Sequence, residues 1–323
     1  QQGVVGKERI QALAGVLAQE WGGIGWELIV VNDGSTDATS ARARQYAPGA
    51  RLVDQDNQGQ GQAFNAGFLE SKGEILCFLD GDDIWYPGKI AAVRQAFADH
   101  PEAGFVQHPL QTVDGVGRLL QRPRSFPPPQ ISLNDILEGR DVLVGTSGLS
   151  VRRSVFEKIY PVPKDLTTCA DEYVSKHALF FGSARTLPKI LGGLRIHERN
   201  SFQGLDWRPD KIERFLEMTD RLDRHLQDRL RGRGLRLTPQ GRESKLLRRE
   251  TKEILLHGWR DERSRAFAAW AALKDELPIS MFYSFKLLTL LIAVVSPRLY
   301  LKLHGLYSGS PWLPLARMKF IRN

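Results

Sequence analysis

The chain has 323 residues, 42% of them hydrophobic and 25% charged, which is typical of a globular protein large enough for one sizeable domain and an appendage. Its two cysteines, Cys77 and Cys169, are too few and too far apart in sequence for a disulfide framework. The formal net charge of +8 is unevenly placed, because residues 1–206 contain 21 Lys and Arg against 24 Asp and Glu, and the remainder carries +11.

The positive charge is concentrated near the end of the chain, beside apolar residues. Residues 281–323 contain six Lys and Arg and no Asp or Glu. Residues 279–295 are mostly apolar, but a run of 17 residues lies at the lower edge of what crosses a bilayer. We therefore expect a basic, apolar tail at 279–323 that lies on an anionic membrane surface, and no nucleic-acid binding. The alternative is a helical pair that packs on the rest of the chain or in a dimer.

The first part of the chain alternates helical and strand patterns, as a doubly wound α/β sheet does. The helical pattern at 10–17 has no strand pattern before it, so we expect an opening strand to be missing ahead of residue 1. The elements that follow are expected at 26–31 (strand), 38–46 (helix), 50–53 (strand), 63–71 (helix) and 74–79 (strand).

Three carboxylates follow the apolar run at 74–79. Asp80, Asp82 and Asp83 stand close together, and Gly81 permits a turn between them. The continuous apolar run predicts a strand at an interior position of a parallel sheet. Carboxylates so close repel one another unless a cation neutralises them, and oxygen ligands favour Mg²⁺ or Mn²⁺. The alternative is a solvated acidic turn that caps the next helix.

Two further polar segments follow predicted strands. Asp33 comes at the carboxyl end of the strand at 26–31, which is the edge where open α/β sheets bind ligands. Residues 56–62 form a polar loop whose glycines let the backbone approach a ligand. The alternatives are a helix cap supplied by Thr36 or Asp37, and simple loop flexibility.

The order and spacing of these segments resemble a known family. The series VVNDGSTD at 30–37, DNQGQGQAFNAG at 56–67 and FLDGDDIW at 78–85 is similar to glycosyltransferase family 2. These are inverting nucleotide-sugar enzymes of the GT-A fold, an α/β, Rossmann-like architecture of nucleotide-diphospho-sugar transferases with a mixed sheet. The resemblance covers about residues 1–202, and we expect a helical extension after it.

The resemblance implies a role for each acid. Asp33 would accept a hydrogen bond from the pyrimidine base, Asp80 would face the ribose or the metal, and Asp82 would ligate the divalent ion. Asp83 would hold the turn or touch the donor sugar. The resemblance also places donor-binding residues in the glycine-rich segment, at Asn57, Gly59 and Asn65.

A later segment, Arg195 to Ser201, is similar to the run with which the family closes over the diphosphate. Arg195 and His197 alternate to one side of an extended chain, so both are expected to face the phosphates while Ile196 packs inward. His197 is also a candidate metal ligand.

The attacking hydroxyl needs a general base, because it is a weak nucleophile until its proton is removed. In the resembled family an acid at a helix start does this, and Asp171 falls on that position. Glu172 is the alternative, since Ala170 stands where the family often has Glu. Both acids could instead stabilise the helix N-terminus.

The sequence therefore predicts a metal-dependent inverting glycosyltransferase with Mn²⁺ or Mg²⁺. It would move a sugar from a nucleotide-sugar, expected to be a UDP-sugar, to a glycan or lipid-linked acceptor in cell-surface polysaccharide synthesis. The expected domains are a catalytic domain at 1–206, a charged helical region at 207–278 and the tail at 279–323. We expect a cytoplasmic protein, peripheral on the inner face of the membrane, with the C-terminal helices able to form a homo-oligomer.

The alternative function is a catalytically weak GT-A-like module that binds a nucleotide or glycan and acts as a membrane-bound assembly partner. The missing opening strand and Ala170 favour it slightly. A nucleotidyltransferase is a weaker alternative, because it would need a glycine-rich phosphate loop with a lysine near the opening strand.

Overall fold

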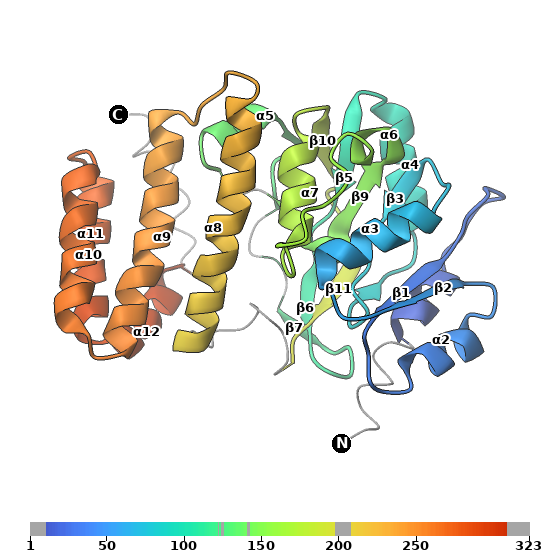
Figure 1. Cartoon of the computed structure of the whole chain (residues 1–323), viewed down its shortest axis with the longest axis horizontal. Helices are drawn as coiled ribbons and strands as arrows, with labels where there is room; N and C mark the ends of the chain where they lie inside the picture. The colour runs from blue at the N-terminus through green and yellow to red at the C-terminus, as the bar shows by residue number, and fades with distance from the viewer. Residues whose placement is uncertain (1–10, 122, 124–125, 141–142, 198–207, 309–323) are drawn as a thin grey trace. The chain divides into compact units, whose positions relative to one another are not determined.

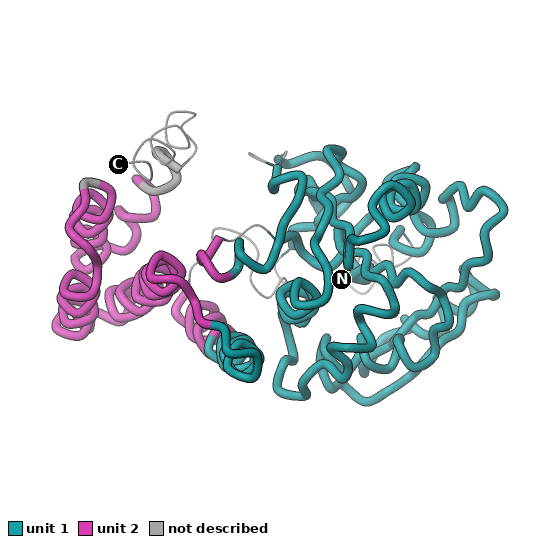
Figure 2. Tube along the Cα trace, turned by 90° about the horizontal axis from the view of Figure 1, so that it is seen from above, with its two compact units in different colours: residues 1–136, 141–201, 220–235 teal, residues 137–140, 202–219, 236–323 magenta. Residues whose placement is uncertain are grey.

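The computed structural model describes residues 11–121, 123, 126–140, 143–197 and 208–308. The chain divides into two compact units (Figure 2). Unit 1 contains residues 1–136, 141–201 and 220–235, and unit 2 contains residues 137–140, 202–219 and 236–323. Predicted boundaries at 206 and 278 differ from this division.

The difference arises at helix α8, Pro209–Arg231, which contributes to both units. Its later half belongs to unit 1, where Arg221 donates to the Asp165 carbonyl oxygen at 2.8 Å and the His225 ring contacts the Asp165 carboxylate at 2.8 Å. Ile212 and Leu216, in its earlier half, lie in the core of unit 2. A composition shift marks where a helix begins, but it does not show which core each turn joins.

Unit 1 begins with the predicted alternation. A helix over residues 11–17 is followed by a small parallel sheet of two strands, whose register runs from Ile29 opposite Arg51 to Asp33 opposite Gln55. The elements are β1 (Ile29–Asp33), α2 (Thr39–Tyr46), β2 (Arg51–Gln55) and α3 (Gln60–Glu70). Helix α3 begins three residues before the predicted 63, because the amides of Gln60 and Gly61 bond to the carbonyls of Thr167 and Leu166.

The largest sheet among the described residues has five strands in the order β3-β9-β5-β10-β8. Figure 1 labels the first four of them. Its members are β3 (Ile75–Cys77), β9 (Leu149–Arg152), β5 (Ala103–Gln107), β10 (Ser183–Thr186) and β8 (Gln130–Ile131). Strand β5 is buried along its whole length and is parallel to β10, whereas the other pairs are antiparallel. The sheet is therefore mixed.

The pairing of β3 differs from the predicted parallel arrangement. Among the described strands β3 pairs with β9 alone, and the two are antiparallel. Its apolar residues are partly buried against a neighbouring core, and such a pattern does not distinguish one pairing direction from the other.

A third sheet, in the order β4-β11-β6-β7, brings later residues beside the acidic turn. Its strands are β4 (Ile84–Trp85), β11 (Gly192–Arg195), β6 (Gln111–Val113) and β7 (Leu119–Gln121). The helices of this part are α4 (Lys89–Asp99), α5 (Leu133–Leu137), α6 (Arg153–Phe156) and α7 (Ala170–Ala178). Because β4 immediately follows the acidic turn and pairs with β11, residues near 82 and 195 become neighbours.

An apolar cavity of about 740 Å³ lies between β1 and β3. Val31 and Leu76 line its strand walls, Phe64 of α3 lines another side, and Asp80 stands at its edge. Within the described residues β1 pairs only with β2 and β3 only with β9, so each strand has one edge without a strand partner.

Unit 2 is helical. Its helices after α8 are α9 (Pro239–Trp259), α10 (Arg263–Glu276), α11 (Met281–Val295) and α12 (Pro297–Ser308). Thr238 and Ser280 are side-chain N-caps of α9 and α11, which fixes where these helices begin. The fully buried Ile254 and Leu273 belong to one apolar core, to which α8, α9, α10, α11 and α12 contribute.

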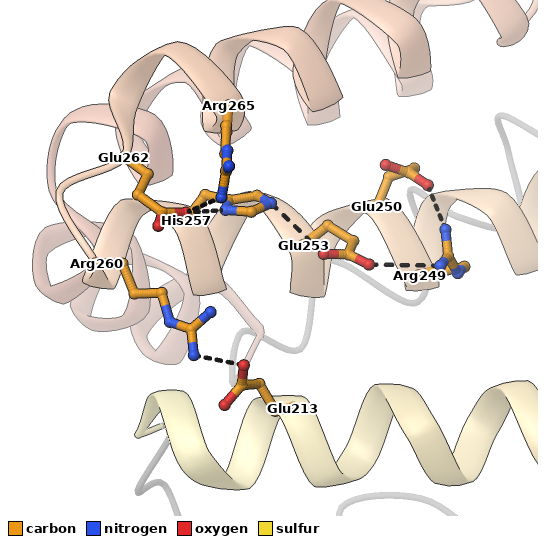
Figure 3. A network of polar contacts seen from close by, with 8 residues as sticks. All are labelled: Glu213, Arg249, Glu250, Glu253, His257, Arg260, Glu262 and Arg265. Atoms are coloured by element: carbon orange, nitrogen blue, oxygen red, sulfur yellow. Dashed lines mark hydrogen bonds and ion pairs between the residues drawn. The ribbon is translucent and has the colours of Figure 1, made fainter.

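Charged side chains join α9 to the start of α10 (Figure 3). The His257 ring contacts the Glu262 carboxylate at 2.6 Å and the Glu253 carboxylate at 3.8 Å. Arg260 forms an ion pair with Glu213 of α8. Glu253 and Glu262 also form ion pairs with Arg249 and Arg265, so these acids are balanced by arginines.

No helix in the described part of the chain combines the length and the apolar character needed to cross a membrane.

Candidate active site

The acidic turn is held by Ser147. The Asp83 amide donates to the Asp80 carbonyl oxygen at 3.1 Å, which closes the turn around Gly81. The Ser147 hydroxyl accepts from the Asp80 amide at 3.1 Å and donates to the Asp83 carboxylate at 2.6 Å. The short segment before β9 therefore fixes both ends of the turn.

Asp83 faces the protein interior. Its side chain is buried, and its second carboxylate oxygen accepts from the Arg195 amide at 2.9 Å. Burial and the charge of Asp82 raise the pKa of Asp83 to about 7. Of the two roles that the sequence left open, this environment favours holding the turn over touching a donor sugar.

Asp80 and Asp171 come together although 90 residues of sequence separate them. Burial raises the pKa of Asp80 well above its ordinary value, and the charges of Asp83, Asp171 and Asp82 raise it further. Burial and the charge of Glu172 raise the pKa of Asp171. A group of acids that raise one another's pKa is a recognised mark of a functional site.

Asp171 lies in the first turn of α7, where the helix dipole favours a negative charge. Glu172 lies beside it but forms an ion pair with Lys176, one helical turn further along. This pairing gives Glu172 a structural role and favours Asp171 as the base.

Two residues for which the sequence predicted no individual role connect these acids. The Gln60 amide nitrogen donates to the Thr146 hydroxyl at 2.9 Å and lies 3.4 Å from the Asp80 carboxylate. Its amide oxygen accepts from the Ala170 backbone at 2.8 Å and so caps α7, which lies beside α3 (Figure 1). Thr146 partly offsets the effect of burial, because its interactions lower the pKa of Asp80 and of Asp171.

Asp82 and His197 form the more open part of the site. The His197 Nε2 atom lies 2.9 Å from the Asp82 Oδ2 atom, and their side chains are 23% and 33% exposed. Both are therefore accessible to a ligand. Their oxygen and nitrogen donors suit Mn²⁺, and Mg²⁺ is commonly held by one or two carboxylates together with substrate phosphates.

The described residues do not supply a complete set of metal ligands. Among the described residues, no three His, Cys, Asp or Glu side chains are grouped so that they could hold an ion. Asp82 and His197, with Asp80 near them, fit an ion that takes its other ligands from a bound diphosphate and water.

Arg195 does not face this opening. Its side chain is fully buried, and its guanidinium donates to the backbone oxygens of Asp82 at 2.6 Å and Gly115 at 2.7 Å and to the side chain of Gln11 at 2.6 Å. This differs from the prediction that Arg195 contacts phosphate. Arg195 instead positions the backbone that carries Asp82. Of the two residues predicted to face the phosphates, only His197 is still a candidate.

Asn65 also differs from its predicted donor-binding role. It is buried in α3, donates to the Val162 carbonyl at 2.9 Å and accepts from the Val162 amide at 2.8 Å. Both ends of its side-chain amide are thus used to hold the loop before α7.

Asp33 shapes the glycine-rich segment. Its carboxylate accepts from the amides of Gln58 and Gly59, each at 2.8 Å, and from the Gln55 side chain at 2.7 Å. Asn57 in the same loop is exposed, which leaves it accessible to a ligand.

The glycines of this segment are needed because other parts of the protein pack closely against them. Gly59 has φ +85°, and a Cβ there would lie 2.5 Å from Thr167 Cα. A Cβ on Gly61 would lie 2.7 Å from the Leu166 carbonyl oxygen. The close backbone approach that the sequence assigned to a ligand is made by the loop that leads to α7.

Comparison with known proteins gives a consistent family. The family model described as Glycosyl transferase family 2 matches residues 10–160. An uncharacterized glycosyltransferase of Nostoc is 34% identical over 203 residues, which is 59% of this chain and 61% of that protein. The chain spans 51% of a second relative, an uncharacterized glycosyltransferase of Haemophilus influenzae.

Solved structures give the fold. The mannosyltransferase PcManGT from Pyrobaculum calidifontis, in complex with GDP-Man and Mn²⁺, matches 96% of this chain and 85% of its own with a TM-score of 0.54 and 18% identity. Staphylococcus aureus TarS 1-349, in complex with UDP-GlcNAc, matches 84% of this chain and 86% of its own with a TM-score of 0.51 and 18% identity. At such identities the likeness concerns the fold.

Proposed function

We propose that this chain, whose residues 10–160 match the glycosyltransferase family 2 model and whose fold is GT-A, transfers a sugar from a nucleotide-sugar donor to an acceptor hydroxyl with inversion at the anomeric carbon. The observation that carries the proposal is the meeting of Asp80, three residues after β3, with Asp171, in the first turn of α7, through Gln60 between them. A donor-side acid and a candidate base belong to one site.

Asp171 is the proposed base. It accepts the proton of the acceptor hydroxyl while that oxygen bonds to the anomeric carbon from the face opposite the nucleotide. The bond between the anomeric carbon and the diphosphate oxygen breaks, and its electron pair leaves with the nucleoside diphosphate. Because the pKa of Asp171 is raised, its basic form is lost at a higher pH than that of an ordinary aspartate.

A divalent ion, Mn²⁺ or Mg²⁺, would be held by Asp82 and His197, with Asp80 beside them. Such an ion stabilises the charge that develops on a departing diphosphate. Arg195 supports this arrangement from behind by binding the Asp82 backbone oxygen. The neighbours bound to GDP-Man with Mn²⁺ and to UDP-GlcNAc support the same class of donor.

The finer assignments rest on the family resemblance. We propose UDP as the nucleotide, with Asp33 and Asn57 near the base and Gly59 in the loop that Asp33 orders. The proposed acceptor is a glycan or a lipid-linked sugar used in cell-surface polysaccharide synthesis. The proposed location is the inner face of the membrane, where such acceptors are found.

Isothermal titration with UDP, GDP and ADP, with Mn²⁺ and with chelator, tests the donor site. We expect UDP to bind best with Mn²⁺, and Asp82→Asn to weaken that binding roughly 100-fold, to the level seen with chelator. The matched control is Asp99→Asn, an exposed acid at the end of α4 that contacts Gln95.

Failure to bind any of the three nucleotides, by a protein that remains folded, would overturn the proposal. Nucleotide binding without transfer to any acceptor would instead support the catalytically weak module. Equal weakening by Asp99→Asn would show that the effect is one of overall charge.

A further inference from the structure

We propose that the exposed faces of α11 and α12 dock on the surface of an anionic membrane. The proposal goes beyond the function proposed above. It rests on that function only in one respect, namely that a lipid-linked acceptor would lie in the same membrane. It is carried by the side chains of unit 2 alone.

Helix α11 has an apolar face that the core of unit 2 leaves uncovered. Phe285, Leu288 and Val295 are 52%, 64% and 69% exposed and recur at spacings of three and seven residues, which places them on one face. On the opposite face Leu290 and Ala293 are fully buried in the core. A helix that needed only to pack on its own unit would carry polar residues on the outer face.

Helix α12, which contacts α11, also has exposed residues, with a different composition. Its exposed residues alternate between basic and apolar, with Arg298 and Lys302 beside Leu299 and Leu303. Long basic side chains can keep their charged ends at the level of lipid headgroups while their stems and the leucines enter the apolar layer. Ser296 is the single residue between the two helices.

The two helices are held in a fixed arrangement by polar contacts within unit 2. Lys286 of α11 donates to the Tyr300 hydroxyl of α12 at 3.0 Å. The Trp270 indole of α10 donates to the Leu287 carbonyl oxygen at 2.8 Å. The exposed surface is therefore presented by a packed scaffold and does not depend on ordering an isolated helix.

Charge selects the membrane as the occupant. Residues 281–323 contain six Lys and Arg and no acid, whereas the α9 and α10 region pairs its acids with cations (Figure 3). An interface with a second copy of this chain would place Lys302 among apolar residues, where protein interfaces are depleted of lysine. Anionic lipid headgroups complement Arg298 and Lys302 directly, and each basic residue near such a surface adds attraction.

Co-sedimentation of the full chain with vesicles tests the proposal. One set contains phosphatidylglycerol with phosphatidylcholine, and the other contains phosphatidylcholine alone. We expect binding to the anionic vesicles, and Phe285→Ser with Leu288→Ser should lower the partition coefficient at least ~10-fold by removing apolar contact with lipid. Arg298→Gln with Lys302→Gln should lower it roughly 10-fold on anionic vesicles and leave neutral vesicles unaffected.

The matched control is Phe267→Ser on α10, because Phe267 is also 52% exposed and belongs to the same unit. It should bind vesicles as the unmodified chain does. Equal binding to both vesicle types, no binding to either, or an equal loss in Phe267→Ser would overturn the proposal. A dimer in light scattering that the Phe285 and Leu288 variant converts to monomers would assign the surface to a second copy instead.

Nucleotide titration of the same variants separates this proposal from the function. Variants that lose vesicles but still bind UDP support both. A chain that binds vesicles but no nucleotide would refute the donor site and leave the membrane surface standing.

Discussion

Carboxylates gather in both units, but they are balanced in different ways. In unit 2 the hydrogen bond from His257 lowers the pKa of Glu262, so the charged form is favoured (Figure 3). In unit 1 burial and neighbouring acids raise the pKa of Asp80 and of Asp171, so their charged forms are disfavoured unless a cation binds nearby. We infer that the lack of compensation, more than the presence of acids, marks the site.

The largest expected effect tests the uncompensated acid directly. Asp171→Asn keeps the shape of the side chain but cannot accept the proton of the acceptor hydroxyl. We expect turnover to fall by roughly 10²–10⁴-fold, the usual contribution of a general base, with UDP affinity unchanged. Steady-state kinetics with the best acceptor, beside nucleotide titration, measures both quantities.

The matched control is Glu172→Gln, one residue along the same helix. Its carboxylate pairs with Lys176, so we expect turnover to change by less than about 3-fold. If Glu172→Gln causes the larger loss of turnover, the base is Glu172. In that case an ion pair with a lysine does not distinguish a structural acid from a catalytic one.

The second prediction contrasts the two units by pH. The pKa of Asp83 rises from 3.8 to about 7 in the folded protein. Its contribution to stability is therefore fully present below pH 4 and is lost as pH rises through 7. Between pH 5 and 8 we expect the free energy of unfolding of the unmodified chain to fall by about 3 kcal/mol relative to Asp83→Asn. Urea unfolding at several pH values measures this difference.

Glu262→Gln is the comparison from unit 2. Because the pKa of Glu262 lies below its ordinary 4.5, its contribution is present above that value and is lost only as pH falls further. The difference between this variant and the unmodified chain should stay constant from pH 5 to 8. If the difference in the free energy of unfolding changes with pH equally for Asp83→Asn and Glu262→Gln, the charge of Asp83 is balanced by its neighbours as that of Glu262 is.

The candidate acids could be proposed from the sequence because each stands next to the end of a predicted strand or the start of a predicted helix. Asp80 and Asp82 follow a strand, and Asp171 begins a helix, and such ends gather at one edge of an α/β fold. The family match at 10–160 includes the first two but not Asp171. The assignment of the base therefore depends on the structure, which places Asp171 beside Asp80.

The roles of Arg195 and Asn65 could not be predicted in the same way. Whether a polar side chain meets a ligand or a backbone carbonyl depends on which distant segment packs against it. Arg195 binds Gly115 and Gln11, and Asn65 binds Val162, all far away in sequence. A buried polar group takes whatever partner the fold supplies.

The strand expected ahead of residue 1 stays a prediction. Among the described strands β1 pairs only with β2 and β3 only with β9, and an apolar cavity lies between β1 and β3.

Gln60 gives the smallest expected effect and the sharpest view of how the site is assembled. Gln60 hydrogen bonds to Thr146 and to the Ala170 amide, which are 86 and 110 residues away. Because both partners are distant in sequence, the local pattern could not predict this role. Gln60→Ala leaves the first amide of α7 without its cap and frees Thr146 from one partner. We expect turnover to fall roughly 10-fold, with the donor KM unchanged, because Asp171 loses its position while the nucleotide contacts remain.

Gln62→Ala is the matched control, since Gln62 stands two residues further along α3 and donates to the Val162 carbonyl at 3.2 Å. Both variants remove one glutamine from one helix, so a purely structural role for Gln60 would give them similar losses of Tm and of turnover. A fall in turnover confined to Gln60→Ala would show that it positions the acids. Equal effects would place Gln60 with Asn65 and Arg195, among the polar residues that hold the fold.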